Sequence, residues 1–233
     1  MKKLIVLTGA GISAESGIST FRDSDGLWEH YRVEDVATVE GFERNPKQVL
    51  DFYNQRRRET LACKPNYGHV GLAELEKYFE VDIITQNIDN LHERAGSTSV
   101  LHLHGELIKA RSSKNEDLIV DLPEDKDIQL GDKAPDGSQL RPFIVWFGES
   151  VPNITQAISL VEDADVFLIV GTSLNVYPAA SLVNYMRRGS PIYLIDPKPV
   201  IVPDNRNLTV FQMGASEGMK KFVSEMKTKY ALE

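Results

Sequence analysis

Short apolar runs alternate with amphipathic stretches along most of this chain of 233 residues. Six runs have the length of a strand, and several are apolar at every position, as in a sheet that is covered on both faces. Such strands, separated by helices, predict an α/β fold with a doubly wound parallel sheet of the Rossmann type. The runs are the one that follows Lys3, and residues 81–85, 99–103, 166–170, 192–195 and 208–212.

The stretches between these runs predict the helices. Asn45 can cap a helix over residues 46–61, in which Pro46 suits the first turn. An apolar stripe at spacing i, i+3, i+4, i+7 predicts the last helix. The stripe consists of Met219, Phe222, Val223 and Met226. Further helices are predicted over 66–79, in a short segment that ends at Ala95, and over 155–162 and 178–188.

Two segments interrupt the alternation of strands and helices. Residues 31–77 carry helices without a strand signal, and the stretch 24–45 is polar and irregular. Residues 111–140 hold eight acidic and four basic side chains, which predicts a solvated, loop-rich insertion before an extended aromatic run at 142–147. We predict one unit over 1–233, with a large domain of about 1–30, 78–110 and 141–233 and a small inserted domain of about 31–77 and 111–140.

Small or polar residues follow five of the predicted strands. Ligands of doubly wound sheets bind beyond the carboxyl ends of the strands. Five such segments therefore predict a binding site along one edge of the sheet. They are residues 8–11, 86–89, 104–105 and 171–173, and Asp196.

The first of these segments has the form of a dinucleotide-binding turn. Gly9 can make the tight bend, Gly11 lets the backbone approach a pyrophosphate, and Ala14 is small enough for close helix–strand packing. An ordinary Rossmann dehydrogenase also needs an acidic residue after its second strand, about 20 residues further on. The acids at that distance, Asp23 and Asp25, lie in a polar loop without a preceding strand. The turn predicts a nucleotide but does not favour an oxidoreductase.

Composition narrows the class of protein. The apolar share of 42% supports a packed core, and the net charge of −8 argues against a nucleic-acid partner. The single cysteine, Cys63, excludes an intrachain disulfide and a cysteine-rich metal site, and it fits a reducing compartment. The first apolar run is too short for a signal peptide or a membrane span. We expect a cytoplasmic monomer that has no membrane partner.

The histidines leave several interpretations open. His102 and His104, on alternate positions of one predicted strand, share a face, but no third and fourth metal ligand is evident, so we expect no metal site. His104 stands at the ligand edge, where it is either a general base or structural. His92 does not begin a zinc-protease motif, because position 96 is Gly, and His69 is expected to be packed or on the surface.

Three further side chains have both a structural and a functional interpretation. The run Arg56 to Arg58 is most simply a solvated helix face, yet Tyr53 and Arg56 are three residues apart and share a side. A phenol beside a guanidinium is a good receptor for a carboxylate. Asn87 and Asp89 are either caps of the short helix that follows them or site residues.

Taken together, five motifs in the same order resemble the sirtuins, a family of NAD-dependent protein-lysine deacylases. The motifs are the segment from Gly9 to Arg22, Gln86-Asn87-Ile88-Asp89, His104-Gly105-Glu106-Leu107, Val145-Trp146-Phe147-Gly148-Glu149, and Gly171-Thr172-Ser173 with Val176-Tyr177-Pro178-Ala179.

The resemblance implies that NAD is consumed and that acyl-lysine proteins or peptides are the partners. It implies that His104 is the general base on a ribose hydroxyl, with Asn87 and Asp89 in the nicotinamide and ribose pocket, and that nicotinamide and O-acyl-ADP-ribose are released. The expected cofactor-binding residues are Gly9, Ala10, Gly11, Ser13, Ala14, Phe21, Arg22, Gln86, Asn87, Ile88, Asp89, Gly171, Thr172, Ser173, Asp196 and Ala215. The substrate backbone is expected to pair along Val145, Trp146, Phe147 and Gly148.

The segment from Phe52 to Arg58 resembles the desuccinylase and demalonylase branch of the family. There a Tyr and an Arg three residues apart hold the distal carboxylate of the acyl group, and Tyr53 and Arg56 match that pair. We expect removal of succinyl and malonyl groups, and also of acetyl.

Two departures from the family pattern are visible. The family usually has two Cys-x-x-Cys pairs for a structural zinc, but residues 105–144 contain no cysteine, so we expect a small domain without zinc. Asp196 stands where the family often has Asn. The alternatives to a deacylase are a hydride-transfer oxidoreductase, a non-catalytic module that binds acyl-lysine or ADP-ribose, and a protein ADP-ribosyltransferase.

Overall fold

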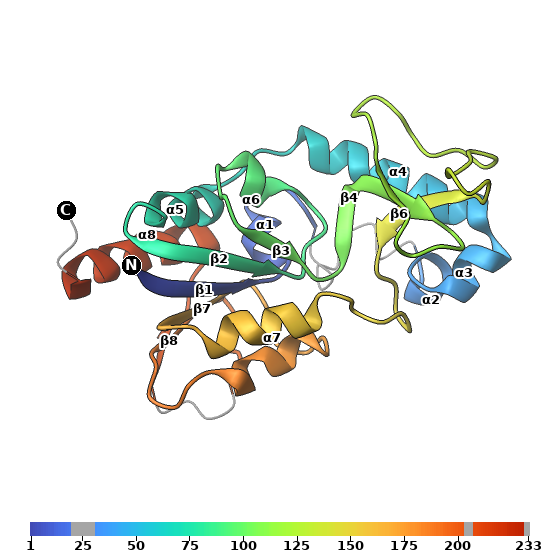
Figure 1. The fold of residues 1–233 in the computed structure, drawn as a ribbon. Helices are drawn as coiled ribbons and strands as arrows, with labels where there is room; N and C mark the ends of the chain where they lie inside the picture. Colours follow the sequence, from blue (N-terminus) through green and yellow to red (C-terminus); the bar gives the residue numbers. More distant parts are fainter. Residues whose placement is uncertain (20–30, 203–206, 231–233) are drawn as a thin grey trace.

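A computed structural model describes residues 1–19, 31–202 and 207–230 of the chain. Phe21 and Arg22, two of the residues expected to bind the cofactor, lie outside this described part. Two sheets and the helices around them make up the fold (Figure 1).

The larger sheet confirms the predicted fold class. Its six strands lie in the order β3-β2-β1-β7-β8-β9 and every neighbouring pair is parallel. In chain order this is the 3-2-1-4-5-6 arrangement of the Rossmann fold, whose ligands bind where the strand order reverses, here between β1 and β7. The strands are β1 (Lys2–Thr8), β2 (Phe79–Thr85), β3 (Val100–His102), β7 (Val166–Val170), β8 (Ile192–Ile195) and β9 (Leu208–Phe211).

Alternate residues of the strands supply two cores, because successive side chains of a strand point to opposite faces. Leu4 and Val6 of β1 pack with Met219 of α8 (Ala215–Tyr230) and its neighbour α5 (Tyr67–Leu75) on one face. Ile5 and Leu7 pack on the other face with α7 (Ile154–Glu162) and the 3₁₀ helix η2 (Ala179–Tyr185). The predicted stripe of α8 is confirmed, since all four of its side chains are buried.

Two predicted helices differ from the structure. The second one ends at Leu75, because Phe79 already begins β2 and pairs with Lys2 of β1. The segment predicted as a helix over 178–188 is the shorter η2, where the Ser181 N–H bonds to the carbonyl of Pro178, three residues back. The described helices include none long and apolar enough to cross a membrane.

The smaller sheet is antiparallel, with the order β5-β4-β6, and lies beside α2, α3 and α4 at one end of the molecule (Figure 1). Its strands are β4 (Gly105–Ser112), β5 (Ile119–Asp121) and β6 (Leu140–Ile144). The helices are α2 (Val33–Val36), α3 (Val39–Arg44) and α4 (Pro46–Ala62). A third core joins sheet and helices through Phe42, Phe52, Leu107, Ile144 and Trp146.

Local signals explain α3 and α4. The Thr38 hydroxyl accepts from the Gly41 N–H at the start of α3, and the Asn45 side chain accepts from the Gln48 N–H at the start of α4, as predicted for the latter. The prediction that residues 24–45 are irregular is wrong where α2 and α3 lie, and residues 24–30 fall outside the described part of the chain. The division into domains at 110 and 141 stays a prediction, and β4 and β6 both cross it.

Candidate functional site

Two glycine turns touch where the strand order of the large sheet reverses. The Gly11 N–H donates to the carbonyl of Gly171 at 2.8 Å, which joins the turn after β1 to the turn after β7. A Cβ on Gly11 would lie 2.6 Å from the Cα of Gly171, and one on Gly171 would lie 2.2 Å from the nitrogen of Ile12. Since Gly171 also has φ of +63°, any side chain here would separate the turns.

The helix that the first turn opens is short. The single turn α1 (Gly11–Ala14) buries Ile12 and Ser13, while Ala14 is exposed. The prediction that Ala14 provides close helix–strand packing is therefore wrong, because the other side of α1 faces the sheet. Ala10 is partly buried beside it.

Ser13 is the centre of a buried hydrogen-bond chain. The Asn66 N–H donates to Nδ1 of His69, so His69 presents Nε2–H to the Ser13 Oγ, 3.3 Å away. Ser13 donates in turn to Oδ2 of Asp89 at 3.0 Å and accepts from Nδ2 of Asn87 at 3.1 Å. Burial lowers the pKa of His69 to about 4, so this histidine is packed and neutral.

Asp89 has a capping role and a place in the site at once. Its Oδ1 accepts from the N–H of Leu91, the first residue of α6 (Leu91–Arg94), at 3.1 Å. Burial raises the pKa of Asp89, while the bonds from Leu91 and Ser13 oppose that rise. Ile88, between the two site residues, packs against the core of the smaller sheet, and its carbonyl accepts from the Leu107 N–H. The segment 86–89 thus connects the large parallel sheet to the core of the smaller antiparallel sheet.

His104 carries the arrangement expected of a base. Its Nδ1 lies 3.0 Å from the carbonyl of Gln86, and a carbonyl only accepts, so Nδ1 holds the proton and Nε2 has a free lone pair. Burial lowers the pKa of His104, which keeps the ring neutral at pH 7. The Gln86 side chain donates to Oγ1 of Thr172 at 3.0 Å, so residues from three strand ends meet here.

His102 does not share a strand face with His104, contrary to the prediction, because β3 ends at His102. Its Nδ1 lies 3.1 Å from the Asn87 carbonyl and its Nε2 lies 2.8 Å from Oε1 of Glu93. Both partners only accept, so the ring donates twice and is an imidazolium. Burial lowers the pKa of His102, but the bond and charge of Glu93 outweigh it and leave the pKa raised.

In the described part of the chain, no group of three or more His, Cys, Asp or Glu side chains is placed to hold a metal ion.

A second group of candidates lies on α4. Tyr53 and Arg56 are both buried, with Arg56 8% exposed. The Trp146 Nε1–H donates to the Tyr53 hydroxyl at 3.0 Å. Within the described residues, Arg56 has neither a hydrogen bond nor an ion pair; Glu59 and Asp89 lie near enough to raise its pKa against the lowering by burial, without pairing.

The interpretation of 56–58 as a solvated helix face is wrong for the first two arginines. Arg57 is buried and donates to the carbonyls of Leu122, Pro123 and Lys126. Only Arg58 is exposed, where it pairs with Asp127. Periodicity alone cannot distinguish these three neighbours, because the segment around residues 122–126 that covers Arg57 is distant in the sequence.

The segment after β6 runs between the two groups. The Val145 N–H donates to the His104 carbonyl at 3.0 Å, and the Phe147 N–H donates to the Ala37 carbonyl at 2.9 Å. The Trp146 N–H donates to Oε2 of Glu149 at 2.8 Å. These three N–H groups are therefore used within the chain, and the pairing of a substrate backbone along residues 145–148 stays a prediction. The Phe147 side chain is half exposed.

The last candidates lie further along the same edge of the sheet. Asp196 follows β8, and its Oδ1 accepts from the Lys198 N–H at 2.8 Å. Ser173 is partly buried in the turn after β7. Ala215, the first residue of α8, is buried at the end of the helix that packs near α1.

Two contacts of the site were not predicted from the sequence. His69 completes a capping box with Asn66, and the spacing of those two residues was a usable signal. The bond from Trp146 to Tyr53 joins residues 93 positions apart, and no local pattern marks it.

The comparisons with known proteins agree with one another. Residues 9–178 match the model of the family described as "Sir2 family". An NAD-dependent protein deacylase of Bacteroides thetaiotaomicron is 60% identical over 225 residues, which cover 95% of this chain and 96% of that protein. One of Helicobacter pylori, strain ATCC 700392, is 59% identical over 198 residues, with coverage of 85% and 86%.

Solved structures agree with these relatives. A complex of a Sir2 homologue mutant with ADP-ribose has a TM-score of 0.89 and 39% identity, and the match covers 100% of this chain and 94% of that one. A Sir2 homologue in complex with NAD has a TM-score of 0.88 and 40% identity, with coverage of 100% and 91%.

Proposed function

This chain belongs to the Sir2 family and is an NAD-dependent protein deacylase, and we propose that it favours lysine acyl groups that end in a carboxylate, such as succinyl and malonyl. The observation that supports this preference is Arg56, a residue that is 8% exposed and whose guanidinium has no acceptor among the described residues. Burial lowers the pKa of Arg56, and a carboxylate bound at its guanidinium would offset that effect.

Tyr53 and Arg56 lie one helical turn apart and can share one acyl carboxylate. The guanidinium offers a planar fork of N–H donors, and the phenol offers one O–H. An acetyl group ends in a methyl, which has no oxygen to accept hydrogen bonds from these donors. The pair therefore discriminates by the terminal charge of the acyl group, whereas the rest of the site acts on the common lysine amide.

The turns at residues 9–13 and 171–173 meet at the carboxyl ends of β1 and β7, where doubly wound sheets bind their ligands, and we assign them to the phosphates of NAD. Gln86 and Asp196 stand at the same edge, where we assign them to the cofactor. NAD supplies an electrophilic ribose carbon when its nicotinamide leaves. Solved Sir2 relatives that hold NAD or ADP-ribose support this placement.

His104 is the proposed general base. Because Gln86 holds the proton on Nδ1, the Nε2 lone pair is free to accept a proton from a ribose hydroxyl. Asn87 and Asp89 are fixed by Ser13 at the neighbouring strand end, where we assign them to the nicotinamide and ribose pocket. We also assign acyl-lysine proteins as the partners of a cytoplasmic monomer; the net charge of −8 argues against a nucleic-acid partner, and the single cysteine fits a reducing compartment.

The test is a set of peptides that are identical except for an acetyl, malonyl or succinyl group on one lysine. NAD consumption gives kcat/KM for each peptide, and mass analysis identifies O-acyl-ADP-ribose. We expect higher kcat/KM for the acidic groups than for acetyl. A higher value for acetyl would contradict the preference, and ADP-ribose attached to protein would favour a transferase.

A further inference from the structure

The Trp146 indole determines which way the Tyr53 hydroxyl donates. An indole N–H is only a donor, so the bond of 3.0 Å makes the Tyr53 oxygen the acceptor. Burial raises the pKa of Tyr53 well above its ordinary value, so the phenol keeps its proton. That proton points away from Trp146 and is left for another acceptor. Accepting from Trp146 also polarises the O–H and strengthens its donation.

Trp146 is itself held from two directions. Its backbone N–H donates to Oε2 of Glu149 at 2.8 Å. The guanidinium of Arg141 lies over the indole, 3.8 Å from the ring centre, and Nη2 of Arg141 donates to both oxygens of Glu149 at 2.7 and 2.8 Å. Trp146 and Arg141 are both nearly fully buried, at 2% and 3% exposure. The indole therefore has little freedom to turn its N–H away from Tyr53.

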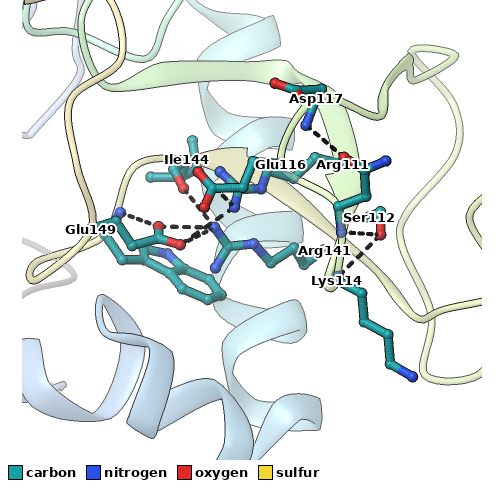
Figure 2. Close-up of polar contacts among 10 residues, drawn as sticks. Arg111, Ser112, Lys114, Glu116, Asp117, Arg141, Ile144 and Glu149 are labelled. Atoms are coloured by element: carbon teal, nitrogen blue, oxygen red, sulfur yellow. Dashed lines mark hydrogen bonds and ion pairs between the residues drawn. The ribbon is translucent and has the colours of Figure 1, made fainter.

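Two arginines, Arg111 and Arg141, pair with the one carboxylate of Glu149, so this group carries a net positive charge. Figure 2 shows Arg111 and Arg141 both directed toward Glu149, with Arg111 at 3.5 Å from its Oε1. Glu116, at 3.9 Å from Arg111, is largely exposed and is screened by solvent. Burial raises the pKa of Tyr53; the charges of Arg141 and Arg56 lower it and that of Glu149 raises it less, so the positive charges act at the hydroxyl. An anion beside that hydroxyl is favoured by the same field.

We propose that Trp146, held by the ion pair of Arg141 and Glu149, is a positioning residue that makes the Tyr53 hydroxyl a donor to the carboxylate of an acidic acyl group. This inference rests on the proposed preference for acidic acyl groups. It assigns to the small sheet a part in acyl selection, because Arg141 belongs to β6 and Glu149 follows it.

The experiment combines Trp146→Phe with Tyr53→Phe in a double-mutant cycle. Phe at 146 keeps an aromatic ring below Arg141 and removes the N–H. We expect Trp146→Phe to lower kcat/KM for succinyl-lysine relative to acetyl-lysine by roughly 2- to 10-fold, mainly through KM. In the Tyr53→Phe background the same change should not alter the ratio further. If Trp146 had only a structural role, its replacement would lower kcat/KM for both substrates equally in both backgrounds. That result would overturn the proposal.

Two controls keep the outcomes distinct. If Tyr53→Phe and Arg56→Met leave the succinyl to acetyl ratio unchanged, the preference for acidic groups is wrong. If they change it and Trp146→Phe does not, only the positioning role is wrong. Should Trp146→Phe not fold, Arg141→Lys replaces it, since Lys keeps the charge and loses the flat fork. Arg141→Lys is then expected to lower the ratio of kcat/KM for succinyl-lysine to that for acetyl-lysine, and not to lower it further in the Tyr53→Phe background. An unchanged ratio would overturn the proposal.

Discussion

The Nδ1 of His104 donates to the backbone carbonyl of Gln86 across 3.0 Å, and this bond decides which nitrogen of the ring can act as a base. Gln86 follows β2 and His104 precedes β4, so the bond joins the ends of two chain segments. Because the acceptor is backbone, the tautomer is set independently of any other side chain.

Replacement of His104 by Ala should abolish turnover and leave the fold intact. The side chain is only partly buried, so its loss removes few contacts, whereas loss of a general base costs about 10²- to 10⁴-fold in rate. Nicotinamide release with a succinyl-lysine peptide measures the first effect and thermal unfolding the second. Nicotinamide release at the wild-type rate would refute the role of His104.

The pH dependence of kcat/KM should have its acidic limb below pH 6.5. Burial lowers the pKa of His104 beneath its ordinary value of 6.5, so the ring stays neutral until the pH falls through that lowered value. The rate should decrease as the pH falls further, because the protonated ring cannot accept a proton. A pH series with a non-titrating acetyl-lysine peptide checks this. A midpoint above 6.5 would contradict the assignment.

Arg56→Met should lower kcat/KM for succinyl-lysine by 10- to 150-fold, which corresponds to about 1.5–3 kcal/mol for a charged hydrogen bond. The effect on acetyl-lysine should be far smaller, because acetyl has no carboxylate. Arg58→Met is the matched control, since Arg58 lies two residues away on α4 and pairs with Asp127 at the surface. Equal losses on both substrates after Arg56→Met would exclude a carboxylate receptor.

The ion pair of Glu93 and His102 should stabilise the protein more at low than at high pH. The folded-state pKa of His102 is raised, so its contribution is complete below about pH 6.5 and is lost as the pH rises through the folded value. Glu93→Gln should cost about 1 kcal/mol at pH 6, since the carboxylate is partly exposed, and less at pH 9. Urea unfolding at both pH values measures the difference. A larger loss at pH 9 would reverse the sign we assign.

Apolar runs were sufficient to predict the large sheet. Residues 166–170 and 192–195 are strands with the predicted bounds, because every position in them is buried and the sequence is apolar throughout. The glycine turns were equally visible, since backbone contact between two strand ends leaves no room for a side chain. In these segments local sequence and tertiary environment favour the same structure.

The smaller sheet and the helices α2 and α3 beside it were harder to predict. Helices α2 and α3 have four and six residues, too short for a periodic signal, and β5 alternates exposed and partly buried positions. Arg57 looked like a surface residue because the carbonyls that bury it lie 65 to 69 positions away. The same distance in sequence hid the bond from Trp146 to Tyr53, which depends on how β6 and α4 meet.

Hydrogen bonds and ion pairs of arginine and hydroxyl side chains, rather than thiolates, stabilise the smaller sheet and the segments packed on it. Arg57 binds three carbonyls around 122–126, Ser112 bonds to Asp136 and Ser138, and Glu149 joins Arg111 to Arg141. Thiolate clusters are vulnerable to peroxide and to competition for scarce metal, because oxidation or extraction removes the cross-link. These hydrogen bonds and ion pairs are chemically inert to both. The deacylase is thereby expected to keep the smaller sheet and its surrounding helices assembled during oxidative stress and metal starvation.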